Sequence, residues 1–150
     1  MIIYAKINGS MGGIYMEKVQ RRLAREKAVF CIYQWLLVKP EREELNVYLN
    51  SVPELVRDAG TYQYSSDLVN QTIDNEEQLT KELSKYLKKG WTFERLSFLE
   101  RAILLVCASE ILDSDLNEKI VMNEAVEMAK KYCNDDSYRF INGILKQLLG

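Results

Sequence analysis

The sequence contains no histidine among its 150 residues. This absence excludes catalytic triads and dyads with a histidine base, and every metal site that needs a histidine ligand. Only two prolines and seven glycines interrupt the chain, which favours helices over a fold of many strands. The longest apolar run, residues 102–108, is far shorter than the ~20 residues that cross a bilayer. We therefore expect a helical protein with no membrane span.

The sequence also lacks a large excess of positive or negative charge, because its 20 basic and 22 acidic residues leave a net charge of −2. A uniformly basic nucleic-acid binder is excluded, whereas a local basic patch is not. The three cysteines (Cys31, Cys107 and Cys133) form no CxxC pair and lie among apolar residues. We interpret them as buried thiols of a protein in a reducing cytoplasm.

The first fifteen residues differ from the rest, with three glycines, no acidic residue and no helical stripe of apolar residues. We interpret residues 1–15 as an extension that precedes a native start at Met16, and residues 16–150 as one domain. The alternative is a short ordered N-terminal arm. No signal peptide pattern is present in this segment.

Apolar periodicity predicts an all-α bundle. Residues 60–65 are expected to form a loop, and Ser97 with Glu100 forms a capping box. Gly143 interrupts the last helix, which suggests the close approach of another helix. The expected helices span residues 16–37, 41–58 (interrupted near 51–53), 66–88 (ending before Gly90), 97–112 (the central helix), 121–133, and a last helix capped by residues 134–137.

A basic cluster lies in the first helix, where Lys18, Arg21, Arg22 and Arg25 share about one third of the circumference. Further along, the same face carries apolar residues. The first turns should therefore project beyond the core and present guanidinium groups to an anion, since arginine binds phosphate in a bidentate manner. The alternative is an ordinary solvated helix face.

Other chemistry is not indicated. Asp113, Asp115 and Asn117 have the spacing of a calcium loop, but Glu118 stands where such a loop requires glycine. The carboxylate pairs lie in polar segments, and the glycines near residue 10 lack the lysine and hydroxyl of a phosphate-binding loop. We therefore expect no catalytic residue, no metal and no cofactor.

Several segments have characteristic sequences: RRLARE (21–26) leading to YQW (33–35), ERAIL (100–104), EIL (110–112), VMNEAVE (121–127) and DSYRFINGIL (136–145). Together, over about residues 17–149, they resemble the NusB family of bacterial transcription antitermination factors.

The resemblance implies about seven helices in two packed sub-bundles. It also implies binding of boxA RNA together with NusE, a small-subunit ribosomal protein, within the antitermination complex of RNA polymerase. The RNA-contacting positions that the resemblance implies are Arg21, Arg22, Arg25, Tyr33, Asp136 and Phe140, which join Lys18 of the basic cluster. The positions near the ribosomal protein are Glu94 and Glu100, although Glu100 is also the capping-box residue.

A second hypothesis is a homodimeric protein-interaction module in which the dimer covers the arginine face. Leu23 stands where relatives can carry another arginine, which would make a covered face more favourable. An RNA-modifying enzyme is a third possibility, but the chain has neither a glycine-rich cofactor loop nor a second domain to support it.

Overall fold

The computed structural model describes residues 11–113 and 117–150, and for residues 11–18 it describes the backbone alone. Within these residues the chain forms helices and no strands, which confirms the predicted all-α fold. The helices are α2 (Met11–Val38), α3 (Arg42–Asn50), α4 (Pro53–Val56), α5 (Ala59–Asp74), α6 (Glu76–Ser84), the 3₁₀ turn η1 (Phe93–Arg95), α7 (Phe98–Asp113), α8 (Glu118–Tyr132) and α9 (Ser137–Leu148).

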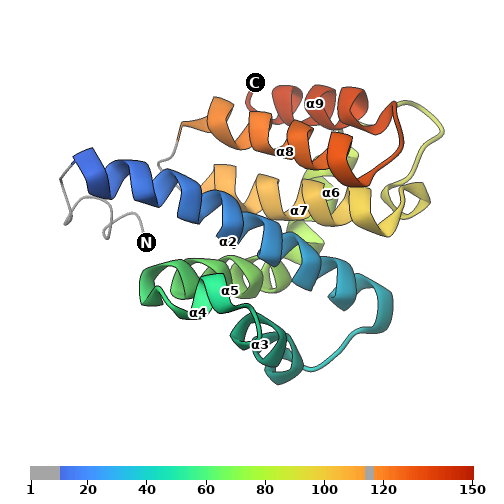
Figure 1. Ribbon diagram of the computed structural model, residues 1–150. Coiled ribbons are helices and arrows are strands. Elements are labelled where there is room, and N and C mark those ends of the chain that lie inside the picture. Colours follow the sequence, from blue (N-terminus) through green and yellow to red (C-terminus); the bar gives the residue numbers. More distant parts are fainter. Residues whose placement is uncertain (1–10, 114–116) are drawn as a thin grey trace.

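The helices form two groups that meet along α2 and α7 (Figure 1). On one side α3, α4 and α5 pack together, and α5 makes the main contact with α2. On the other side α8 pairs with α9 and packs on α7. The first turns of α2 extend past the ends of the neighbouring helices. This arrangement confirms the expected pair of sub-bundles.

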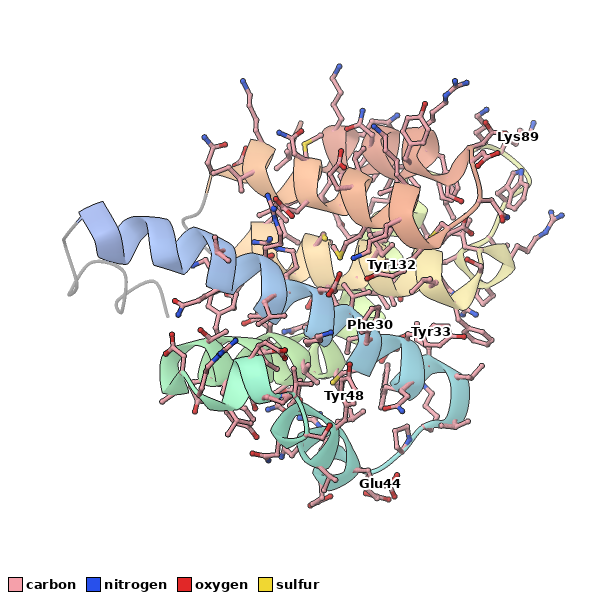
Figure 2. All side chains as sticks on the ribbon, in the orientation of Figure 1. Phe30, Tyr33, Glu44, Tyr48, Lys89 and Tyr132 are labelled. Atoms are coloured by element: carbon pink, nitrogen blue, oxygen red, sulfur yellow. The ribbon has the colours of Figure 1, made fainter. Side chains whose placement is uncertain are left out.

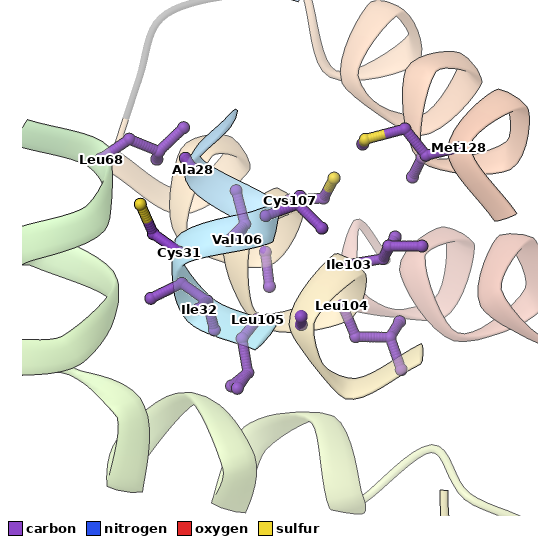
Figure 3. Close-up of a cluster of buried hydrophobic side chains, with 14 of the residues drawn as sticks. Ala28, Cys31, Ile32, Leu68, Ile103, Leu104, Leu105, Val106, Cys107 and Met128 are labelled. Atoms are coloured by element: carbon purple, nitrogen blue, oxygen red, sulfur yellow. The ribbon is translucent and has the colours of Figure 1, made fainter. Parts of the chain in front are cut away.

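The centre of the core is α7, in which every residue from Ala102 to Ile111 is buried. Figure 3 shows Leu105 and Val106 of this helix beside Ala28 and Ile32 of α2, with Ile103 and Leu104 on the opposite side of α7. Burial on all sides explains why residues 102–108 of α7 are all apolar: each large aliphatic side chain gains roughly 1.5–3 kcal/mol by leaving water. The prediction that this helix is central is confirmed.

Of the last three helices, α7 and α8 begin with a side-chain cap and α9 does not. The capping box is confirmed: Ser97 N donates to Glu100 Oε1 (2.9 Å) and Glu100 N donates to Ser97 Oγ (3.2 Å). Asn117 caps α8 by accepting a hydrogen bond from Lys119 N, whereas Asp115 of the rejected calcium loop lies outside the described residues. The expected side-chain cap of α9 is wrong, because Asp136 occupies the cap position without such a bond.

Two expectations in the middle of the chain are also wrong. Residues 60–65 are helical, because Asp58 accepts a hydrogen bond from Gly60 N at the start of α5 and the core then buries Tyr64 and Ser65. The single helix expected over 66–88 is two helices, because Asn75 leaves helical geometry at the junction of α5 and α6. Tertiary burial and a local break have overridden the periodic pattern.

The two glycines with assigned roles behave differently from the prediction. Gly90 has φ +89, a conformation that favours glycine, but α6 ends six residues earlier at Ser84. Gly143 lies in α9, and a Cβ built there would meet nothing within 4 Å. The expected close approach of another helix at Gly143 is therefore wrong.

The cysteines lie mostly in the interior. Cys31 and Cys107 are buried and Cys133 is half-buried, and all three are free thiols. Burial raises the pKa of Cys31 to about 12 and that of Cys133 to about 11. The interpretation as buried thiols is confirmed for the first two residues.

Candidate functional site

The four predicted cations of α2 do not form one exposed cluster. The side chain of Lys18 lies outside the described residues. The Arg21 guanidinium stacks 5.3 Å from the ring centroid of Tyr64, and Arg22 faces solvent. Arg25 is only 2% exposed, so its predicted place in an exposed RNA-contacting cluster is wrong.

The physical reason is a buried ion pair. Arg25 Nε and Nη2 donate to the two carboxylate oxygens of Glu110, and the Tyr64 hydroxyl also donates to Glu110. Burial alone would lower the pKa of Arg25, but the hydrogen bonds and the charge of Glu110 outweigh it and raise the pKa. Burial and the Glu110 charge raise the pKa of Tyr64 as well. Arg25 is thus a charged structural residue.

Arg22 forms an ion pair across the surface with α8. Its Nε donates to both Glu124 carboxylate oxygens at 3.1 and 3.0 Å, and its Nη2 donates to Oε1 at 2.9 Å. The Arg22 side chain is 65% exposed, whereas that of Glu124 is 14% exposed. Because Glu124 is mostly covered and Arg22 is not, an anion from solution can reach the guanidinium from its open side.

This pair lines a groove of about 580 Å³ between α2 and α8. Glu26 lies in the same groove, where it accepts hydrogen bonds from the Tyr132 hydroxyl (2.7 Å) and from Lys131 Nζ (3.4 Å). Burial alone would raise the pKa of Glu26, but Tyr132, Lys131 and Lys27 together lower it. Tyr132 also makes an edge-on contact with Phe30, and Figure 2 shows the two rings between α2 and α8. Carboxylates therefore neutralise much of the basic charge here.

A second groove, of about 640 Å³, lies between α9 and the segment that follows α6. It brings together two predicted RNA-contacting residues, Asp136, which is exposed, and Phe140, which is half-buried. Trp91 lines the same groove. Tyr33 is not among its lining residues and lies exposed on the C-terminal half of α2.

The two predicted partner-binding carboxylates have different surroundings. Glu94 is exposed in the 3₁₀ turn before α7. Glu100 is half-buried in the capping box, and its Oε2 accepts a hydrogen bond from Ser137 Oγ (2.5 Å). Glu100 therefore joins the start of α7 to the start of α9, which is a structural role.

The described residues form neither a metal site nor a membrane-spanning helix. In residues 11–113 and 117–150, no three Cys, Asp or Glu side chains gather as a metal site would need. Over the same part of the chain, no helix is both long and apolar enough to cross a membrane.

The sequence and the fold both match known proteins. The protein-family model described as the NusB family matches residues 22–149. The chain belongs to the NusB family. The match includes α3 to α9 in full and all of α2 from Arg22 onward.

Curated relatives support this membership. The transcription antitermination protein NusB of Macrococcus caseolyticus is 33% identical over 131 residues, covering 87% of this chain and 97% of that protein. The NusB protein of Lactococcus lactis is 41% identical over 114 residues, which are 76% of this chain but only 57% of that protein. The NusB protein of Elusimicrobium minutum is 35% identical over 130 residues, covering 85% of this chain and 91% of that protein.

Chains in several solved structures share the fold. A chain in the crystal structure of the antitermination factors NusB and NusE with double-stranded RNA has a TM-score of 0.77 and 25% identity, covering 86% of this chain and 95% of that chain. NusB of T. maritima has a TM-score of 0.76 and 26% identity, covering 85% and 89%. A chain in the crystal structure of a plectonemic RNA supercoil has a TM-score of 0.79 and 27% identity, covering 87% and 94%.

Sequence reasoning missed three residues of these sites. Glu110 could have been found, because it is the one carboxylate within the mostly apolar stretch 102–112 of α7, and a carboxylate there requires a buried partner. Glu124 carries no such signal, since it is one of many carboxylates on amphipathic helices. Trp91 follows Gly90 in a loop, and only the packing of α9 brings it beside Phe140.

Proposed function

We propose that this NusB-family protein is a non-catalytic adaptor of the bacterial cytoplasm. It binds boxA-type RNA together with the ribosomal protein NusE and thereby helps RNA polymerase to read through terminators in ribosomal RNA operons. The observation that carries this proposal is the match, at a TM-score of 0.77 over 86% of the chain, to a solved complex of NusB, NusE and RNA.

The described residues support two RNA-contacting regions. Arg22 offers an exposed guanidinium to phosphate, with Arg21 next to it in the sequence and Lys18 one turn earlier in the same helix. Asp136 and Phe140 offer a hydrogen-bond acceptor and an aromatic ring to an RNA base, and Tyr33 offers a third contact from α2. Arg25 is removed from this set. Glu94 is proposed as the contact to NusE.

The alternative remains a homodimer that covers the arginine face. The side chain of Leu23, which would favour such a covered face, is half-buried and packs against the core, so only part of its apolar surface is open to a partner.

The proposal is tested by measuring binding of boxA RNA and of a scrambled RNA of equal length, each with and without NusE. We expect preferential binding of boxA RNA, with NusE increasing the affinity. Equal affinity for both RNAs in the presence of NusE would contradict the proposal. Light scattering on the same samples reports whether the protein is a monomer in the RNA complex.

A further inference from the structure

The groove beside α9 contains a glycine that the fold itself does not explain. Gly143 lies in the middle of α9, where glycine costs about 1 kcal/mol relative to alanine. A Cβ at this position would meet nothing within 4 Å, so no neighbouring part of the described protein requires a glycine here. The open space instead belongs to the groove that Gly143 lines with Trp91 and Phe140. This suggests that the space is kept open for something that enters the groove.

The wall opposite α9 presents an aromatic surface. Trp91 is 48% exposed, which is unusual for so large an apolar side chain. The Arg95 guanidinium stacks on the indole, with Cζ 4.5 Å from the ring centroid. This cation–π contact holds the indole while leaving about half of its surface in solvent.

The charge of the groove favours an anionic ligand. Lys88 and Arg139 line it, whereas Asp136 is its one acidic lining residue among the described residues. Arg95 adds a third cation against Trp91. Lys89 is exposed on the same connection, and Figure 2 shows it at the edge of the molecule. A ligand with a flat apolar part and a negatively charged backbone would satisfy both the aromatic surface and these cations.

We propose that this groove is a pocket for an unpaired RNA base, which stacks on the Trp91 indole while Gly143 leaves room for it. Unpaired bases are commonly held by aromatic rings and arginine planes, and single strands follow basic grooves. This inference rests on the proposed function, since it assumes that RNA is the ligand. It adds Trp91 as a stacking residue and Gly143 as the residue that sets the depth of the pocket.

The chain offers a direct spectroscopic test, because Trp35 and Trp91 are its two tryptophans. In the variant Trp35→Phe, all indole fluorescence comes from Trp91. Titration with single-stranded boxA RNA should quench this fluorescence and protect it from acrylamide. The same RNA annealed into a duplex should leave it unchanged. Unchanged fluorescence at saturating single-stranded RNA would overturn the proposal.

Affinity measurements on three variants complete the test. Trp91→Ala should weaken binding of single-stranded boxA RNA by about fivefold or more, since stacking on an aromatic residue contributes strongly to each bound base. Gly143→Leu should weaken binding similarly by filling the pocket. Gly143→Ala is the matched control: it should bind RNA within about twofold of the wild type and unfold at a higher temperature, because alanine favours the helix.

The outcomes separate this inference from the proposed function. If the wild type does not prefer boxA RNA, the proposed function fails. If the wild type binds boxA RNA and both Trp91→Ala and Gly143→Leu bind it equally well, only the base pocket fails. If these two variants keep RNA binding but lose NusE binding, the groove holds a protein segment and the base pocket is again wrong. Circular dichroism checks that each variant is folded.

Discussion

Nε and Nη2 of Arg25 donate hydrogen bonds to the two carboxylate oxygens of Glu110, at 2.5 and 2.8 Å, in the interior between α2 and α7. The two side chains are 3% and 1% exposed. The Tyr64 hydroxyl from α5 donates to the same carboxylate. Three helices therefore meet at one buried charge pair. The basic charge that the protein can offer to RNA is correspondingly smaller than its arginine count suggests.

The first prediction concerns the stability of this pair. Arg25→Met should lower the free energy of unfolding by roughly 3–5 kcal/mol, because it leaves the Glu110 carboxylate buried without its counter-charge. Urea unfolding at pH 7 measures this change. The double variant Arg25→Met with Glu110→Leu should be less destabilised than Arg25→Met alone, since no charge then remains buried.

Reversing the charge at Arg25 should destabilise the protein more than removing it. The sequence alone suggests that Arg21→Glu combined with Arg25→Glu weakens RNA binding without unfolding the protein. The structure indicates instead that Arg25→Glu places a second carboxylate beside Glu110 and prevents folding. A folded Arg25→Glu variant with reduced RNA affinity would show that Arg25 is a surface residue after all.

The spacing of residues in the sequence indicates that Arg25 lies on the buried face of α2. Arg25, Val29 and Ile32 have the spacing i, i+4, i+7, and the last two are fully buried. A cation in register with two core residues requires a buried partner, and α7 supplies one. The number of cations on the helix does not reveal this partner, whereas the register of Arg25 with the core residues does.

Other features show what sequence can and cannot predict. The capping box at Ser97 depends on residues three positions apart, so local sequence determines it. The helical state of residues 60–65 depends on burial of Tyr64 and Ser65 by other helices, which no local pattern records. The groove at Gly143 forms only when α9 lies beside Trp91, and the chain alone does not show that packing.

The second prediction concerns the Arg22–Glu124 pair as a competitor of RNA. The Glu124 carboxylate binds the guanidinium that we propose contacts an RNA phosphate. If the two compete, Glu124→Gln should strengthen RNA binding by about 1.4- to 5-fold, equivalent to the roughly 0.2–1 kcal/mol of a surface ion pair. Arg22→Gln should reduce the slope of log affinity against log salt by about 0.7, the contribution of one phosphate contact on a single strand. Titrations at several salt concentrations measure both effects.

The control for this pair is Arg57→Gln, which removes an exposed arginine at the end of α4, in the other group of helices. Its salt slope should equal that of the wild type. If Arg22→Gln also leaves the slope unchanged, Arg22 does not contact phosphate. If Glu124→Gln weakens binding, the carboxylate orients the guanidinium for RNA and does not compete with it.

The third prediction is a pH dependence at Glu26. Its pKa is lower in the folded protein than the ordinary value of 4.5, so the ionised form contributes stability that is fully present above that value. This contribution disappears as the pH falls through the folded pKa. Glu26→Gln should therefore be less stable than the wild type at pH 7, and the difference should shrink as the pH falls below 4.5.

Urea unfolding at a series of pH values measures this difference. Glu127→Gln is the control, because its side chain is 70% exposed and its contact with Lys130 is a surface pair at 3.9 Å. We expect its stability difference from the wild type to stay small throughout. A deficit for Glu26→Gln that is constant or grows toward acid pH would show that Tyr132 and Lys131 do not stabilise the ionised carboxylate.

The fourth prediction separates Glu94 from Glu100, which the family resemblance places together near the ribosomal protein. Glu100 accepts hydrogen bonds from Ser97 N and Ser137 Oγ, so Glu100→Ala should cost about 1–2 kcal/mol of stability. Ser137→Ala removes only the second bond and should cost less than Glu100→Ala. Glu94 is exposed, so Glu94→Ala should change stability by no more than about 0.5 kcal/mol.

Thermal unfolding and NusE titration on the three variants should therefore assign stability to Glu100 and partner binding to Glu94. A Glu94→Ala variant with wild-type NusE affinity would remove Glu94 from the interface, and an undiminished stability of Glu100→Ala would show that the connection from α7 to α9 is not held by this carboxylate.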